Sequence, residues 1–121
     1  MSNTEKRVAI YCRVASHDEM ALTLQTERMK DFVAGKAGWV LTGVYCDEAA
    51  SAAVDERSGL QKLLSDAKAQ AFDAVAVYSF SRLARSRELL ESINRTLNGN
   101  GIEIESATGE VLLRFSMDSN E

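Results

Sequence analysis

The 121-residue sequence contains no proline, no internal repeat and no low-complexity stretch, and so predicts a single domain over residues 1–121 without a linker. No apolar run approaches the roughly 20 residues that a membrane span needs. The first six residues lack the apolar core of a signal peptide. These absences lead us to expect a cytoplasmic protein with no membrane partner.

Cysteine and histidine are scarce. The two cysteines, Cys12 and Cys46, fall inside predicted strands, where a small buried thiol is common. Disulfides are rare in the cytosol, and no metal-ligand spacing is present. The single histidine, His17, lies at the start of a predicted helix, where a solvated first-turn residue is a better interpretation than a general base. We therefore expect no metal and no cofactor.

Positive charge is in short supply, because the formal net charge is −4 and the pI is about 5.1. Non-specific affinity for DNA comes mainly from Lys and Arg side chains that neutralise phosphates. An acidic domain should therefore bind duplex DNA poorly unless its cations are gathered in one place. Three arginines do cluster, at Arg82, Arg85 and Arg87. The average charge argues against a DNA partner, and the local charge does not.

What the chain does contain is an alternation of strand-like and helix-like segments. Residues 7–14, apart from their Arg ends, and residues 72–78 are almost continuously apolar, which is typical of strands covered on both faces. Apolar residues near 3.6-residue spacing mark the helices between the strands. The predicted buried faces are Leu60, Leu63, Leu64 and Ala67 in the second helix and Leu83, Leu90, Ile93 and Leu97 in the third. This order predicts an α/β domain with a mainly parallel sheet of four to five strands and helices on both faces. The predicted strands are 7–14, 39–46, 72–78, 102–105 and, as a fifth, 111–115.

Helix boundaries are predicted from capping residues. Ser16-His17-Asp18-Glu19 has the pattern of a capping box, with Ser16 as N-cap and Glu19 at the third helical position. Ser79 or Ser81 can cap the third helix, which Asn98-Gly99-Asn100-Gly101 ends. Residues 47–56 are polar and rich in alanine, and predict a loop.

Three segments stand where predicted strands end or helices begin, and ligands of such sheets bind beyond the carboxyl ends of the strands. They are Tyr11-Cys12-Arg13-Val14, Asp55-Glu56-Arg57-Ser58-Gly59-Leu60 and Arg82-Leu83-Ala84-Arg85-Ser86. Together and in this order, they resemble the catalytic domain of serine recombinases of the resolvase/invertase family over nearly the whole of residues 7–110. The resemblance implies the resolvase catalytic-domain fold.

The resemblance also implies a chemistry. In that family a serine attacks a DNA phosphate, forms a phosphoserine linkage and releases a 3′-hydroxyl for strand exchange. Guanidinium groups bind phosphate oxygens bidentately and stabilise the charge of the transition state. By resemblance Arg13, Arg57, Arg82 and Arg85 would form that clamp; the alternative is that they are ordinary surface charges. The implied partners are the DNA phosphate backbone and a second recombinase subunit, of the same or another kind.

Four positions depart from the family pattern, and two of them, Glu19 and Glu27 in the first predicted helix, fall about where the family usually has glutamines. Ala15 stands where the family carries its nucleophilic serine, and Ser81 stands where an aspartate is usual beside the first arginine of the third segment. Ser16 is the nearest replacement nucleophile, although adjacent side chains leave a strand in opposite directions and an N-cap role would explain Ser16 by itself. The hydroxyls of Tyr11 and Ser81 are weaker candidates.

Three functions therefore compete. The first is a site-specific DNA recombinase of a mobile element, acting in recombination or integration through Ser16 or a variant site. The second is a catalytically inactive, resolvase-like module that binds DNA or a partner recombinase and regulates it. The third is a small phosphate- or nucleotide-binding protein, which is weakly supported because no glycine-rich loop follows the first strand.

Overall fold

The computed structural model describes residues 5–14, 18–48, 57–84 and 86–109. Within them, four parallel strands form one sheet in the order β2-β1-β3-β4. The strands are β1 (Lys6–Val14), β2 (Trp39–Glu48), β3 (Ala74–Val77) and β4 (Glu103–Ser106). The helices are α1 (Glu19–Ala34), α2 (Ser58–Lys68) and α3 (Arg87–Asn98), with a 3₁₀ turn η2 (Phe80–Arg82) after β3. The predicted fifth strand lies outside the described residues.

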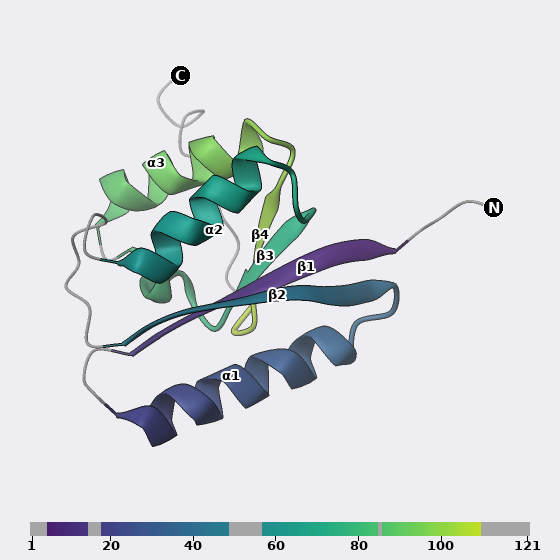
Figure 1. Ribbon diagram of the computed structural model, residues 1–121, viewed down its shortest axis with the longest axis vertical. Helices are drawn as coiled ribbons and strands as arrows, with labels where there is room; N and C mark the ends of the chain where they lie inside the picture. Colours follow the sequence, from purple (N-terminus) through teal and green to yellow (C-terminus); the bar gives the residue numbers. More distant parts are fainter. Residues whose placement is uncertain (1–4, 15–17, 49–56, 85, 110–121) are drawn as a thin grey trace.

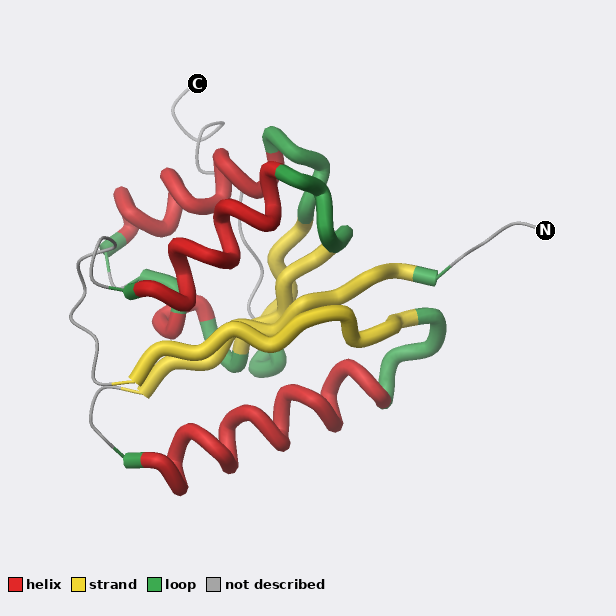
Figure 2. The backbone as a smooth tube through the Cα atoms, viewed as in Figure 1, coloured by secondary structure: helices red, strands yellow, loops and turns green. Residues whose placement is uncertain are grey.

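The sheet is the middle of three layers. Helix α1 covers one face, and α2 and α3 lie together on the other (Figure 1). The backbone tube shows the same arrangement, with β3 and β4 turned steeply relative to β1 and β2 (Figure 2). The predicted α/β fold, with a parallel sheet and helices on both faces, is confirmed. Among the described residues, no helix combines the length and the apolar character that a bilayer crossing requires.

The position of β1 between the two helix layers explains why residues 8–12 of its sequence are all apolar. Val8, Ile10 and Cys12 enter the core beneath α1, whereas Ala9 and Tyr11 enter the core beneath α2 and α3. Successive side chains of a strand point to opposite faces, so a strand with helices on both sides has no solvent face to make polar. Each large apolar side chain buried in this way contributes roughly 1.5–3 kcal/mol.

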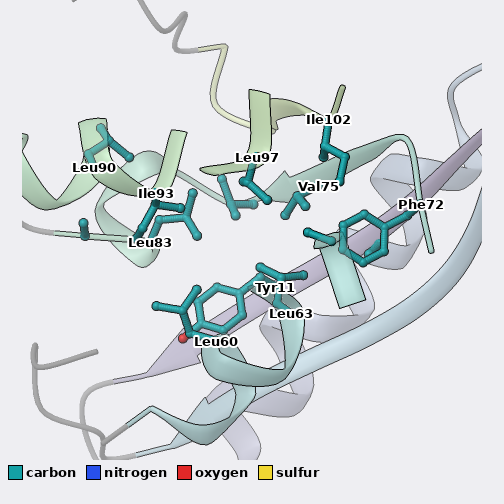
Figure 3. Packing of buried hydrophobic residues seen from close by; sticks show 14 residues of the cluster. Tyr11, Leu60, Leu63, Phe72, Val75, Leu83, Leu90, Ile93, Leu97 and Ile102 are labelled. Carbon is teal, nitrogen blue, oxygen red and sulfur yellow. The ribbon is translucent and has the colours of Figure 1, made fainter. Parts of the chain in front are cut away.

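The larger core lies between the sheet and the α2–α3 layer (Figure 3). It contains Tyr11, Phe72 and Val75 together with side chains of the two helices. The helical stripes that the sequence predicts are buried here. They are Leu60, Leu63 and Ala67 of α2, and Leu90, Ile93 and Leu97 of α3.

The strand order places a topological switch point between β1 and β3. The chain passes from β1 through α1 to β2 on one side of β1, and then through α2 to β3 on the other side. β1 pairs with β3 only over Val8–Tyr11, whereas it continues beside β2 as far as Val14. Beyond Tyr11, β1 and β3 therefore diverge, at the position where doubly wound sheets bind their ligands.

The predicted capping box at the start of the first helix is wrong. Helix α1 begins at Glu19, and Asp18 is its N-cap, with the Asp18 Oδ1 accepting from the backbone N–H of Ala21 at 3.0 Å. Asp is as good an N-cap as Ser, and its negative charge favours the helix N-terminus. Ser16 lies outside the described residues, and α1 is capped without it.

The predicted cap of the third helix is also wrong. Helix α3 begins at Arg87, and its N-cap is Ser86, whose hydroxyl accepts from the backbone N–H of Leu89 at 3.0 Å. Ser79 instead precedes the 3₁₀ turn η2 and makes no side-chain cap there. The chain therefore turns once at η2 before it enters α3.

Candidate active site

Arg13 lies near the carboxyl end of β1 and is 4% exposed. Its Nε donates to the backbone carbonyl oxygen of Arg82 at 3.0 Å, and its Nη2 donates to that of Ser81 at 2.8 Å. On the other side, the Arg13 backbone exchanges two hydrogen bonds with the Gln25 side chain of α1, at 3.1 and 3.2 Å. Arg13 thus ties the end of β1 to both η2 and α1.

Arg57, the residue before α2, is completely buried. Its Nη2 donates to the Arg82 carbonyl oxygen at 3.0 Å, and its Nε and Nη2 donate to the Tyr11 hydroxyl at 3.2 and 3.0 Å. Its guanidinium carbon also lies 5.5 Å from the centre of the Tyr11 ring, a cation–π arrangement. One backbone carbonyl, that of Arg82, therefore accepts hydrogen bonds from both Arg13 and Arg57.

The prediction that the loop begins at residue 47 is wrong, because β2 extends through Asp47 to Glu48. The Asp47 carboxylate is buried and accepts from three donors: the Tyr11 hydroxyl at 2.6 Å, the Gly59 N–H at 2.8 Å and the Leu60 N–H at 3.0 Å. It thereby caps the N-terminus of α2 from a neighbouring strand. Burial, and then the hydrogen bond to Asp47, raise the pKa of Tyr11, so this phenol stays neutral and connects Asp47 to Arg57.

Gly59 allows this arrangement. A Cβ at position 59 would clash with the carbonyl oxygen of Cys46 on β2. The first turn of α2 therefore rests directly on the backbone of β2, which brings the Gly59 N–H onto Asp47 and places Arg57 beneath η2. Only glycine fits such a close approach.

Arg82 differs from the other two arginines because its side chain faces a pocket. The pocket has a volume of about 300 Å³ and lies between α1 and the end of β3. Arg82 Nε and Arg57 Nη1 are buried without a hydrogen-bond partner, and neither residue forms an ion pair within the part of the chain that the structure describes. Buried N–H groups of this kind are costly unless a ligand accepts from them. The pocket is lined by Ala21, Leu24, Gln25, Arg28, Tyr78 and Arg82.

The structure brings together Arg13, Arg57 and Arg82 from three separate elements, at the switch point of the sheet. Ser81 is exposed, and its Oγ lies 2.9 Å from the Oγ of Ser79. The other residues that the sequence singles out for the site are outside the described ranges. These are Ala15, Ser16 and Arg85.

Sequence reasoning missed Asp47 and Gln25. The signal for Gln25 is a polar residue on the apolar stripe of α1, four residues before Met29 and three after Leu22. No local signal marks Asp47, because its partners are donated by residues 11, 59 and 60 from other elements.

The structure is an α/β domain in which three arginines gather at the carboxyl end of a parallel sheet. The family model "Resolvase, N terminal domain" matches residues 8–120, and the chain belongs to this family. No curated protein sequence matches the chain significantly.

Solved structures of recombinases have the same fold. The N-terminal catalytic domain of TP901-1 integrase is 32% identical with a TM-score of 0.77, over 88% of this chain and 81% of that one. The C-terminal catalytic domain of ISC1926 TnpA, an IS607-like serine recombinase, is 29% identical with a TM-score of 0.75, over 83% and 69%. A resolvase family site-specific recombinase from Streptococcus pneumoniae is 25% identical with a TM-score of 0.73, over 88% and 75%.

Proposed function

We propose that this chain is the catalytic domain of a site-specific DNA recombinase, which binds a backbone phosphate at its arginine cluster and cleaves the strand with a serine hydroxyl. The observation that carries the proposal is the convergence of Arg13 and Arg57 on the carbonyl of Arg82. The two buried arginines fix η2, so the Arg82 side chain is held at the switch point with an unpartnered N–H. A preorganised guanidinium is suited to the charge that develops on a phosphate during attack.

Ser16 is the nucleophile in this proposal. Because Asp18 caps α1, a capping role no longer accounts for Ser16. Attack of the Ser16 hydroxyl would form a phosphoserine bond and release a 3′-hydroxyl, and the serine proton would pass to solvent. Asp47, the buried carboxylate of the site, is occupied by three donors and serves to position α2.

A second candidate function is a catalytically inactive regulatory module that binds DNA or a partner recombinase. Two observations favour it. Ala15 occupies the position where family members carry the serine, and Ser81 replaces their carboxylate with a hydroxyl that pairs with Ser79. This module would retain the arginine cluster and cut nothing.

The test of cleavage is a covalent adduct between the purified chain and end-labelled duplex DNA, detected on a denaturing gel. The variants are Ser16→Ala, Ala15→Ser and, as a matched control outside the attack position, Ser79→Ala. We expect an adduct with the natural chain and with Ser79→Ala, and none with Ser16→Ala. An adduct that appears only in Ala15→Ser would establish the inactive module, and one that survives in Ser16→Ala would reject Ser16 as the nucleophile.

The test of anion binding is the rise in melting temperature with added sulfate, a stand-in for the DNA phosphate. A ligand that binds only the folded state stabilises it by RT ln(1 + [L]/Kd), about 1.4 kcal/mol at tenfold excess over Kd. We expect Arg82→Ala to lose most of this rise, while Arg95→Ala, an exposed arginine at the end of α3, keeps it. An equal response in both variants would reject the phosphate site.

The proposal includes an assembly and a location. By analogy with family members, we propose that this single domain acts in the cytoplasm as a homo-oligomer or paired with another recombinase. Sedimentation of the purified chain, with and without DNA, measures self-association directly. A chain that stays monomeric in both conditions would leave pairing with another recombinase as the remaining form of assembly.

A further inference from the structure

The two cysteines are neighbours across two parallel strands. Cys12 of β1 and Cys46 of β2 are directly paired in the register of the sheet, and both are free thiols. Both side chains belong to the core beneath α1, where the hydroxyl oxygen of Thr26 lies 3.9 Å from the Cys46 sulfur. The two sulfur atoms and one hydroxyl therefore form a cluster that the arginine site does not use.

The two thiols have different environments. Cys12 is fully buried, whereas Cys46 is partly exposed near the edge of the sheet, since β2 is an edge strand. A hydrogen bond from the Cys12 thiol lowers the pKa of Cys46, with a smaller lowering from Thr26, and the same thiol pair together with burial raises the pKa of Cys12. The charges that act on Cys46 are Lys30, which favours its thiolate, and Asp47, which opposes it.

We propose that Cys46 is a site of reversible thiol modification and that Cys12 is its resolving partner. The co-reactant is a small-molecule disulfide, such as oxidised glutathione. The Cys46 thiolate attacks one sulfur of that disulfide, forms a mixed disulfide and expels the other half as a thiolate. Cys12 then attacks the Cys46 sulfur, which forms the Cys12–Cys46 bond and expels the second half of the small disulfide, and the Cys12 proton leaves with that half as a thiol. The two cysteines lose two electrons, and the small disulfide gains them.

The sheet makes the product easy to reverse. Neighbouring strands lie about 4.7–4.9 Å apart, and a disulfide needs its two Cβ atoms about 3.5–4.5 Å apart. The strand spacing lies within the roughly 4.4–6.8 Å that disulfides allow between Cα atoms, so only the Cβ atoms must approach. Because Cys46 is partly exposed, a small reductant can reach the bond, and exposed disulfides are readily reduced. The next residues along the strands are Arg13 and Asp47, which hold η2 and α2. Oxidation would thus act at the base of the arginine site, although the thiol chemistry does not depend on whether DNA is cleaved.

The first experiment follows the mass and free thiols of the folded full chain during incubation with oxidised glutathione. We expect the natural chain to lose both thiols without retaining glutathione, and to recover them with a small dithiol reductant. Cys12→Ser should retain one glutathione on Cys46, and Cys46→Ser should take up none. A natural chain that keeps glutathione together with a free Cys12 would overturn the resolving role, and one that never reacts would overturn the site.

A second measurement needs no variant. Brief labelling of the natural folded chain with iodoacetamide, followed by peptide mapping, gives separate rates for the two cysteines. We expect Cys46 to be labelled well before Cys12, and the midpoint of its rate against pH to lie below the ordinary thiol value of about 8.5. Equal rates, or a midpoint at or above that value, would contradict the inference.

Discussion

The two ends of the sheet each carry an arginine on β1 or beside it, and they hold it differently. At the amino end, Arg7 forms an exposed ion pair with Asp73, with Nε and Nη2 donating at 3.2 and 3.1 Å. At the carboxyl end, Arg57 is buried and donates to a phenol and a backbone carbonyl. The first arginine meets an anion of the protein itself, and the second meets neutral oxygen atoms.

This difference shows how a protein of net charge −4 can offer a cationic site. A carboxylate partner cancels the charge of its arginine toward any further anion. Neutral acceptors fix the geometry of a guanidinium, and at Arg57 the Asp47 carboxylate binds the far side of the Tyr11 hydroxyl instead of pairing with the guanidinium directly. Overall composition does not distinguish the two cases, because both ends contain arginine near a strand terminus. Under the proposed function, the carboxyl end, where the acceptors of the guanidinium are neutral, is the end that binds a phosphate.

The largest loss of stability is expected from a substitution at Gly59, where the backbone of α2 packs directly against β2 at the carboxyl end of the sheet. We predict that Gly59→Ala lowers the free energy of unfolding by about 3 kcal/mol, because its Cβ would push α2 away from the Cys46 carbonyl. Gly35→Ala, at the end of α1, is the matched control, since Gly35 has helical φ and only an ordinary contact at 3.4 Å. Urea unfolding of both variants tests this. Equal stabilities would mean that α2 does not rest on β2 as described.

Removing one hydroxyl from the buried network should be the next largest effect. Tyr11→Phe leaves Asp47 without one donor and Arg57 without its phenol acceptor, which we expect to cost about 2 kcal/mol. Tyr45→Phe removes a similar bond, to Asp66 at 2.7 Å, at a partly exposed position and should cost less. Urea unfolding gives both values, and a larger loss in Tyr45→Phe would reverse the assigned importance of the two sites.

The dependence of stability on pH should separate the two ends. Arg7 lowers the pKa of Asp73 at the amino end, so the stability from this pair is present above the ordinary Asp pKa of about 3.9 and is lost as pH falls through the lowered value. Burial raises the pKa of Tyr11 at the carboxyl end, so its contribution is present below about pH 10 and is lost as pH rises further.

Two variants test which residue causes the loss of stability at acid pH and which causes the loss at alkaline pH. Asp73→Asn should reduce the loss of stability at acid pH, and a remainder should persist because the hydrogen bond from Tyr45 also lowers the pKa of Asp66. Tyr11→Phe should reduce the loss at alkaline pH. Burial also raises the pKa of Tyr45 to about 12, so a smaller alkaline loss should remain in Tyr11→Phe. Melting temperatures measured across the pH range test both statements, and a loss at acid pH that is unchanged in Asp73→Asn would contradict the first.

The smallest effect is expected from Arg7→Ala, because exposed ion pairs contribute little. Its difference from the natural chain should shrink further in about 1 M salt, where charges are screened within about 3 Å. The difference caused by Tyr11→Phe, which is buried, should persist at the same salt concentration. Unfolding at low and high salt compares them, and a salt-sensitive Tyr11→Phe effect would show that water reaches the carboxyl-end network.

The fold could be predicted because its signals are local and repeated. Three apolar runs and the short alternating segment 102–105 mark the strands, and the spacing of Leu60, Leu63 and Ala67 marks the buried face of α2. The caps were less predictable: Ser16 and Asp18 are both good N-cap residues two positions apart, and the local sequence does not choose between them. A helix can therefore be predicted more reliably than the residue at which it begins.

The internal connections of the site could not be predicted. Arg13, Arg57 and Arg82 were identified from their positions, but their shared contact is a backbone carbonyl, which every residue possesses. Asp47 looks like a loop residue until the N–H groups of α2 are placed above it. Contacts between distant segments depend on the closed tertiary structure, which no local pattern encodes.

The carbonyl of Arg82 also has a consequence for how this domain can change. Two buried arginines grip the main chain of η2, and none of the three hydrogen bonds to the carbonyls of Ser81 and Arg82 involves the side chain of either residue. Substitutions at 81 or 82 can therefore alter the chemistry of the site while its frame stays in place. Sequence libraries at these two positions should yield many folded proteins, and a lineage could lose or regain activity there without passing through unfolded intermediates.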